Sequence, residues 1–217
     1  MGVELAELRR EEFAAALAGL SPEPLAPEAL EALWAHYQEL RRWSPRLALI
    51  GRGTAEEVLV RHYGESLAAL PFVPVAPRAG GGLVDLGSGA GFPGFVLAAA
   101  RPGWPVTLVE ARQKKWAFLE AARRRAALSC RCLDARVGAR LPAGLPERIE
   151  MVTVRALRLP AEAWRALLTR RTPGARLLLW SGRKPVSLPA ELRITAERPL
   201  PGATDRRLLI AEPCESP

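Results

Sequence analysis

One stretch of sequence decides the fold: LVDLGSGAGFPG, residues 83–94. A short apolar run that contains an acid gives way to glycines spaced two apart, and the helix-like residues 95–101 follow. This order is typical of a buried strand, a tight loop and a helix N-terminus. Gly87, Gly89 and Gly91 favour a loop that passes close under a ligand, because no Cβ restricts their φ values. We expect the backbone N–H groups of this loop to face that ligand.

The next predicted strand, residues 105–110, ends in a carboxylate. Glu110 follows Gly89 by 21 residues. An acid at the tip of the second strand of a βαβ unit is placed to accept hydrogen bonds from ribose hydroxyls. We therefore expect an adenosine-containing cofactor, and the pattern leaves its other half open. A tight turn that binds nothing is the alternative interpretation of the glycines.

Strand and helix patterns alternate over the rest of the chain. They predict strands at 83–86, 105–110, 129–133, 149–154 and 175–181, and helices at 91–101, 113–127 and 160–171. This alternation indicates an α/β fold with a Rossmann-like, mostly parallel sheet and helices on both faces. Residues 192–195 and 207–211 flank a turn and predict a hairpin. We therefore expect seven strands, the last pair antiparallel.

Residues 1–80 have helical rather than strand-like patterns. Apolar positions at helical spacing predict one helix over residues 3–19 and a second from Pro27 to the Ser44-Pro45 pair. The stretch Thr54-Ala55-Glu56-Glu57 matches a capping box and predicts a third helix. We therefore expect an N-terminal helical extension, residues 1–80, and a sheet domain, residues 81–217.

Positive charge is concentrated in the sheet domain. Residues 1–80 hold 8 Arg and Lys against 11 Asp and Glu, whereas residues 81–217 hold 23 against 12, and the chain has a net charge of +8. Almost all of this excess is arginine, whose guanidinium group binds phosphates in a fork and stacks on bases. The balance indicates a polyanionic partner such as a nucleic acid. Solvated surface charge with no partner is the alternative.

Composition argues against a membrane protein and against a metal protein. No apolar run approaches the roughly 18 residues of a membrane span, and the start Met1-Gly2-Val3-Glu4 resembles an acidic helix rather than a signal peptide. The 3 cysteines, at 130, 132 and 214, match neither a zinc spacing nor a disulfide framework. We expect a cytoplasmic protein that binds no metal and no membrane.

An open parallel sheet that ends in an antiparallel hairpin resembles the class I S-adenosylmethionine-dependent methyltransferases. In detail, residues 26–212 resemble the bacterial ribosomal RNA small-subunit methyltransferase G family, also called glucose-inhibited division protein B. The motifs that carry this resemblance are RHYGESL at 61–67, the glycine loop with its GFPG ending, RP at 101–102, EARQKK at 110–115 and RAL at 155–157. The GFPG ending is more specific than the glycines alone.

The resemblance implies S-adenosyl-L-methionine as the cofactor and N7 of a guanine in 16S ribosomal RNA as the target. It implies contacts of Gly87 and Phe92 with the methionine part and sugar, and of Glu110, Ala111 and Arg112 with the ribose and adenine. It also implies that Asp134-Ala135 contact the adenine, and that Arg155 faces both the cofactor and the target base. Together with Gly89 and Gly91 of the loop, these residues form the expected cofactor site.

The expected chemistry needs few side chains. N7 of guanine carries an in-plane lone pair, so attack on a sulfonium methyl group requires no general base. Catalysis would consist mostly of positioning and exclusion of water, with the guanine unstacked. Arg155 and His62 are the catalytic candidates, although a structural role is the alternative for the helical His62. The expected partner is the 30S subunit, and we expect a monomer.

Departures from the family pattern leave two other functions open. The family has Asn-Leu-Thr within the stretch at 46–50, Asp-Ser where Glu65-Ser66 stand, an acid near 136–137, and Lys-Gly near 181–184. These changes leave the expected cofactor binding intact and bear on the target nucleotide. A ribosome-binding or assembly protein descended from such an enzyme, with methyl transfer lost, is one alternative. An NAD-dependent oxidoreductase would use the same glycine loop, but the terminal hairpin and the basic surface argue against it.

Overall fold

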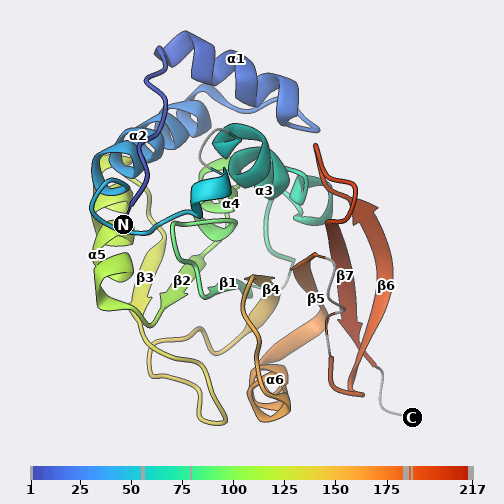
Figure 1. Ribbon diagram of the computed structural model, residues 1–217. Helices are drawn as coiled ribbons and strands as arrows, with labels where there is room; N and C mark the ends of the chain where they lie inside the picture. Colours follow the sequence, from blue (N-terminus) through green and yellow to red (C-terminus); the bar gives the residue numbers. More distant parts are fainter. Residues whose placement is uncertain (1, 55–56, 79, 183–185, 187, 215–217) are drawn as a thin grey trace.

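The structure, a computed structural model, describes residues 2–54, 57–78, 80–182, 186 and 188–214 (Figure 1). It is an α/β fold with one mostly parallel sheet between two layers of helices. The strands are β1 (Gly82–Leu86), β2 (Val106–Glu110), β3 (Arg131–Asp134), β4 (Ile149–Arg155), β5 (Arg171–Ser181), β6 (Leu192–Pro199) and β7 (Arg207–Pro213). The helices are α1 (Arg10–Leu20), α2 (Pro27–Trp43), η1 (Arg52–Thr54), η2 (Leu59–Gly64), α3 (Glu65–Leu67), η3 (Leu70–Phe72), α4 (Gly94–Ala100), α5 (Gln113–Arg125) and α6 (Ala161–Leu168).

The strand order creates a switch point at the centre of the sheet. The order is β3-β2-β1-β4-β5-β7-β6, with parallel pairing from β3 to β5 and antiparallel pairing of β7 with β5 and β6. From β1 the chain moves outward to β2 and β3, and then returns to the other side of β1 as β4. In such sheets, ligands bind beyond the carboxyl ends of the strands at the reversal. The predicted fold class, including the terminal hairpin, is confirmed.

Alternate residues of each strand enter two separate hydrophobic clusters. Leu83 of β1 packs with the helices that include α2, α4 and α5, whereas its neighbour Val84 packs with α6 on the opposite face. Figure 1 shows α6 across the sheet from α2 and α4. Because both faces of the sheet are covered, β1 and β2 are buried along their whole length. This explains why their sequences are nearly continuous apolar runs.

The N-terminal helices share a core with the sheet. Phe13 of α1 and Tyr63 of η2 are fully buried and belong to the same hydrophobic cluster as Phe95 of α4. The ring centroids of Phe13 and Tyr63 are 5.3 Å apart in an edge-to-face arrangement. The division of the chain at residue 80 therefore stays a prediction, and apolar packing is continuous across it.

The first helix begins later than predicted. The sequence pattern predicts it over residues 3–19, but residues 2–9 are not helical and α1 begins at Arg10. The backbone N–H of Val3 donates to Ser44 O at 2.9 Å, and the hydroxyl of Tyr37 donates to Ala6 O at 2.8 Å. These tertiary hydrogen bonds hold the segment along α2. Its apolar side chains, such as the buried Leu5, are therefore packed without a helical turn.

The third predicted helix is present, but most of it is a π-helix rather than an α-helix. Residues 55 and 56 of the expected capping box lie outside the described part of the chain. Thr54 Oγ1 donates to Gly51 O at 2.8 Å and lies 3.0 Å from His62 Nε2. The helical segment that follows is a π-helix, η2, continued by the short α3.

The close contact between α4 and β1 depends on Gly94. A Cβ on Gly94 would lie 2.4 Å from Asp85 Cβ and 2.5 Å from Leu108 Cδ2, so Gly94→Ala forces the helix away from the sheet. We expect this variant to lose about 1–3 kcal/mol of unfolding free energy. Gly19→Ala is the matched control, since nothing lies within 4 Å of its Cβ and a helical Gly→Ala change gains up to about 1 kcal/mol. Urea denaturation measures both, and an equal effect would contradict the close approach.

Candidate active site

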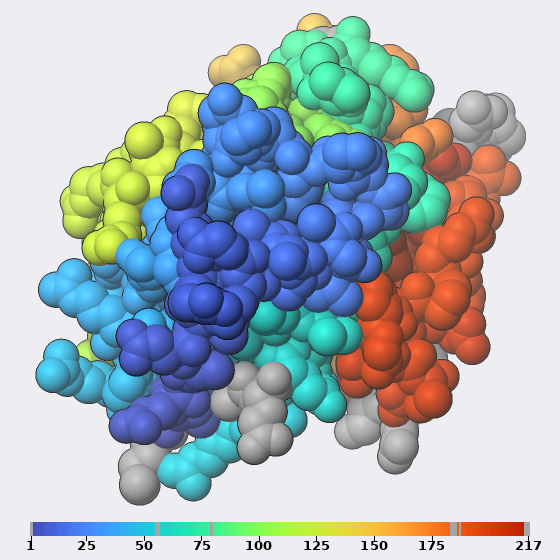
Figure 2. Space-filling model, turned by 90° about the horizontal axis from the view of Figure 1, so that it is seen from above, coloured from blue at the N-terminus to red at the C-terminus, as the bar shows by residue number. Residues whose placement is uncertain are grey.

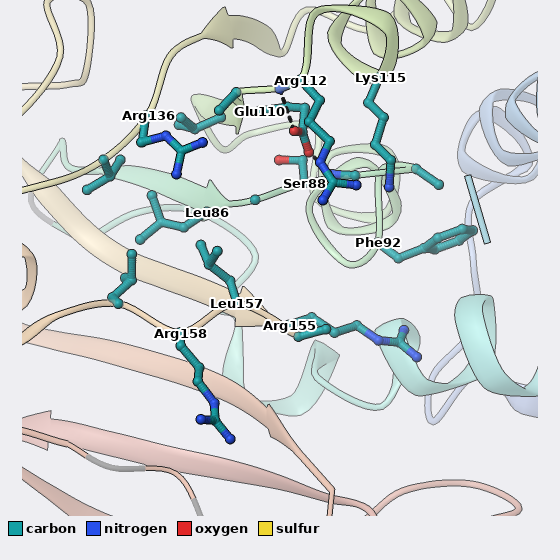
Figure 3. Close-up of a pocket in the computed structure, with 18 of the residues that line it drawn as sticks. Leu86, Ser88, Phe92, Glu110, Arg112, Lys115, Arg136, Arg155, Leu157 and Arg158 are labelled. Atoms are coloured by element: carbon teal, nitrogen blue, oxygen red, sulfur yellow. Dashed lines mark hydrogen bonds between the residues drawn. The ribbon is translucent and has the colours of Figure 1, made fainter. Parts of the chain in front are cut away.

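A cavity of about 620 Å³ lies at the carboxyl ends of the central strands (Figure 3). Loops after β1, β2, β3 and β4 line it, and residues from the N-terminal part close one side. Figure 3 shows Glu110 and Arg112 on one side of the cavity and Arg155, Leu157 and Arg158 on the other. The lining residues are Leu49, Ile50, His62, 86–90, Phe92, 109–112, Lys115, 135–138 and 155–160.

The glycine loop after β1 adopts the backbone conformation that its sequence predicts. Gly87, Gly89 and Gly91 have φ values of +71°, +58° and +91°, in the left-handed region that disfavours side chains. Their N–H groups are not free to face a ligand, which corrects the expectation from the sequence. Gly87 and Ser88 donate to Val109 O at 2.8 and 3.0 Å, Gly91 to Ser88 O at 2.7 Å, and Gly89 to Glu110. The loop uses these donors to hold its own shape.

Glu110 connects the loops that follow β1 and β2. Its Oε2 accepts from the N–H of Gly89 at 2.9 Å, and its Oε1 accepts from the N–H of Arg112 at 2.7 Å. The residue is 7% exposed and lines the cavity. Each carboxylate oxygen has a second lone pair, so Glu110 can hold both loops and still accept a hydroxyl from a ligand.

His36 supports the glycine loop from below, and sequence reasoning did not identify it. Its Nε2 lies 2.8 Å from Ala90 O and its Nδ1 lies 2.7 Å from the Tyr63 hydroxyl. A carbonyl oxygen only accepts, so Nε2 carries the proton and donates, and Nδ1 accepts from Tyr63. The ring is fully buried, with Phe95 at a centroid distance of 4.4 Å, and burial lowers the pKa of His36 to about 4. A histidine in an amphipathic helix carries no sequence signal for this role.

His62 contributes a neutral ring to the cavity wall. Its ring lies 5.0 Å from that of Phe92, with an interplanar angle of 31°. Burial lowers the pKa of His62 to about 3, and the cations Arg155, Arg61 and Arg206 lower it further. The imidazole is therefore neutral near pH 7 and holds no proton to donate as an imidazolium.

Arg155 stands where β4 ends. Its Nη2 donates to Arg61 O and to Glu65 Oε2, both at 2.7 Å. Two residues earlier in β4, Thr153 Oγ1 donates to Asp85 Oδ1 at 2.6 Å. Burial raises the pKa of Asp85 to about 6, and Thr153 is the first of the groups that oppose this rise. The Asp85 carboxylate and the Arg155 guanidinium thus come from the same face of the sheet.

Nine of the predicted site residues line the cavity together. They are His62, Gly87, Gly89, Phe92, Glu110, Ala111, Arg112, Ala135 and Arg155. Gly91 does not line it, since a Cβ there would meet Phe95 Cβ at 2.8 Å and His36 Nε2 at 3.1 Å beneath the loop. Asp134 is exposed and does not line the cavity. The neighbouring Ala135 does. The geometry thus places Gly91 beneath the loop and Asp134 on the surface next to the cavity-lining Ala135, and their part in a cofactor site stays a prediction.

The turn after Arg155 forms a wall of the cavity that the sequence did not indicate. Ala156 has a φ of +54°, which turns the chain across the carboxyl ends of the strands. Leu157 is 40% exposed, and its Cδ2 lies 3.1 Å from the position that a Cβ of Gly87 would occupy. A side chain at position 87 would therefore press on Leu157, in addition to the strain of its positive φ. Residues 46–50 and 136–137, where the chain departs from the family pattern, also reach this cavity through Leu49, Ile50, Arg136 and Val137.

The low pKa of His36 predicts a specific pH dependence of stability. Above pH 6.5 the ring is neutral in both folded and unfolded chains, and between pH 6.5 and about 4 only the unfolded chain takes up its proton. The stabilising effect of the neutral ring is therefore present above pH 6.5 and lost as the pH falls. We expect the difference in unfolding free energy between the wild type and His36→Gln to shrink by about 3 kcal/mol between pH 7 and pH 4. Urea denaturation at both pH values measures it, and a constant difference would contradict the assignment.

Comparisons with known proteins agree on one family. Residues 29–187 match the family described as rRNA small subunit methyltransferase G (GidB). A protein of that name from Stenotrophomonas maltophilia is 36% identical over 178 residues, covering 79% of this chain and 80% of the relative. One from Hyphomonas neptunium is 39% identical over 137 residues, covering 63% and 62%. One from Desulfotalea psychrophila is 44% identical over 90 residues, covering 41% and 40%. The chain thus spans less than two thirds of the length of the last two.

Solved structures share the fold at low sequence identity. A point mutant of MtNAS in complex with S-adenosylmethionine has a TM-score of 0.60 at 15% identity, covering 95% of this chain and 76% of that one. TrmN from Thermus thermophilus has a TM-score of 0.54 at 20% identity, covering 72% and 53%. The family match covers residues 29–187, from α2 to just after β5. This chain belongs to the rRNA small subunit methyltransferase G family.

Proposed function

We propose that this protein transfers a methyl group from S-adenosyl-L-methionine to a guanine N7 of 16S ribosomal RNA. The observation that carries the proposal is the cavity at the switch point, with its glycine loop and the carboxylate of Glu110, in a chain of this family. We propose further that it acts as a monomer in the cytoplasm, with the 30S subunit as its partner. None of the helices in the described ranges has the length and apolar character of a membrane span.

The residues of the cavity fit an adenosyl cofactor. The volume of about 620 Å³ lies within the 300–1,000 Å³ typical of small-molecule sites. Glu110 would accept the ribose hydroxyls through its remaining lone pairs, and Ala111 and Arg112 would border the adenine. Gly87, Gly89 and Phe92 would lie along the rest of the molecule. These two glycines carry no Cβ, so the loop backbone can approach a ligand closely, and their positive φ values disfavour any residue with a side chain.

The chemistry on the protein side is positioning. When bound, S-adenosylmethionine supplies an electrophilic methyl group on a sulfonium. Arg155 would orient the target base, and His62 and Phe92 would present flat rings that exclude water. Neutral His62 adds no charge beside the developing positive charge on the methylated guanine. Attack by N7 requires no proton transfer, so the proposal assigns no general base.

Cations at the mouth of the cavity support an RNA substrate. Arg112, Arg136 and Arg158 line the cavity and are exposed, and no carboxylate pairs with them among the residues that the structure describes. They come from the loops after β2, β3 and β4, so they surround the opening from different sides. An unpaired guanidinium is suited to a phosphodiester. Relatives named for small-subunit rRNA methylation point to the same class of substrate.

Methyl transfer onto ribosomal particles tests the proposed function directly. We expect tritiated methyl groups to pass from S-adenosylmethionine to 30S particles that lack the modification, and mass mapping to place the label at N7 of one guanine. A label on another atom would correct the target. No transfer, together with binding to the 30S particle, would favour the assembly role instead.

Removal of the Glu110 charge tests the cofactor site. Glu110→Gln leaves one acceptor where two oxygens now accept, so we expect its Kd for S-adenosylhomocysteine to rise by about tenfold or more. Glu120→Gln is the matched control, because Glu120 pairs with Arg123 on α5 and does not line the cavity. Titration calorimetry measures both variants. Stabilisation of the wild type by NAD rather than by S-adenosylhomocysteine would reverse the choice of cofactor.

A further inference from the structure

The carboxylate of Glu65 is buried between two arginines. The residue is 1% exposed, its Oε2 accepts from Arg155 Nη2 at 2.7 Å, and its Oε1 accepts from Arg206 Nε at 2.6 Å. Its backbone carbonyl accepts from Trp180 Nε1 of β5 at 2.9 Å. Each oxygen of the side chain therefore has a different cationic partner, and the backbone is held as well.

Arg206 belongs to the turn between β6 and β7, far from Glu65 in sequence. The same hairpin contacts the helical segment 59–72 at two more places. A Cβ on Gly202 would lie 2.9 Å from Val60 Cγ1, and the Arg198 guanidinium lies 5.8 Å from the centre of the Phe72 ring. Figure 2 shows this segment, in teal, between the blue N-terminal helices and the orange-red hairpin. The turn is thus packed against the helical segment that carries Glu65.

Only one of the two terminal nitrogens of Arg155 has hydrogen-bond acceptors within the described residues. Its Nη2 has two acceptors, Arg61 O and Glu65 Oε2, whereas its buried Nη1 has none among residues 2–54, 57–78, 80–182, 186 and 188–214. A buried donor without an acceptor is destabilising, and more so when it is charged. Native proteins keep such groups where a ligand or water completes them. Because Arg155 lines the cavity, a bound ligand is the natural acceptor.

We propose that Glu65 and Arg206 are positioning residues, which fix Arg155 so that its Nη1 donates to an oxygen acceptor of a ligand in the cavity. The inference rests on the proposed function. The acceptor chemistry is a carboxylate, carbonyl or phosphate oxygen, which either the cofactor or the target nucleotide supplies. Glu65 holds the Nη2 edge, and Arg206 holds Glu65 from the opposite side. The terminal hairpin thereby takes part in the site without lining the cavity.

Variants of Arg206 test this positioning, because Arg206 touches Glu65 and does not line the cavity. Arg206→Met removes the second cation, Arg206→Lys keeps its charge, and Glu65→Asp withdraws the carboxylate by one methylene group. Arg176→Met is the matched control, since it breaks a partly buried ion pair with Glu212, 3.2 Å in length, away from the cavity. Thermal unfolding of each variant is recorded first, and all other measurements are made at a temperature where every variant is folded.

We expect Arg206→Met and Glu65→Asp to lower kcat or to weaken ligand binding by about 10–100-fold, as a misplacement near 1 Å does. Arg206→Lys should recover part of the loss, and Arg176→Met should change nothing. The Kd for S-adenosylhomocysteine, measured by calorimetry, rises if the cofactor supplies the acceptor. The Kd and KM for unmodified 30S particles rise, or kcat alone falls, if the nucleotide supplies it.

A purely structural role gives a different pattern. In that case Arg206→Met lowers the melting temperature but leaves kcat, KM and both Kd values at wild-type levels, and the proposal is overturned. Wild-type protein that transfers no methyl group refutes the proposed function instead. The positioning role is then tested by the Kd values for S-adenosylhomocysteine and for 30S particles alone: a rise in either one for Arg206→Met supports it, and no change in both overturns it.

Discussion

The site depends on the carboxylate of Glu110, which joins the loops after the two central strands. The two oxygens accept from Gly89 and Arg112, and in the loop after β1 the N–H groups of Gly87 and Ser88 donate to Val109 O and that of Gly91 to Ser88 O. The glycine loop is therefore shaped before any ligand arrives. A ligand meets a rigid backbone whose hydrogen bonds are already made, and it gains specificity from the spare lone pairs of Glu110. Preorganisation of this kind reduces the entropy that binding must overcome.

The N-terminal helices are part of the site. His36 of α2 donates to the carbonyl of Ala90, which fixes its tautomer, and its other ring nitrogen accepts from Tyr63 of η2. The lining of the cavity includes Leu49, Ile50 and His62, all of which precede residue 80. The helices that cover one face of the sheet thus also hold the loop from below. Fully buried aromatic rings, among them Phe13 and Tyr63, make this arrangement stiff.

Charge around the cavity is arranged in two layers. Exposed arginines surround the opening, where they attract a polyanion over a distance set by the ionic strength. Deeper in the structure, the buried carboxylate of Glu65 pairs with Arg155 and Arg206, and the buried Asp85 accepts from the hydroxyl of Thr153. Buried pairs contribute little net stability but fix geometry, since breaking one leaves a charge without compensation. The cations nearby also add to the effect of burial in keeping the pKa of His62 low, at about 3.

The sequence by itself determined the sheet and the position of the loop. The local signals were the hydrophobic period, the glycine spacing and the acid at residue 110. The strands that they predict match β1 to β7 within a few residues at most boundaries. Local signals failed where tertiary hydrogen bonds decide the conformation, as at residues 2–9, which follow α2 instead of forming a helix. The roles of His36, Glu65 and Arg206 were decided only by the tertiary structure. Their partners lie 54, 90 and 141 residues away in sequence, at Ala90, Arg155 and Glu65, and no periodic pattern spans such separations. These groups come from two helical segments and the turn of the terminal hairpin, and only the packing of those elements against the sheet brings them to their partners.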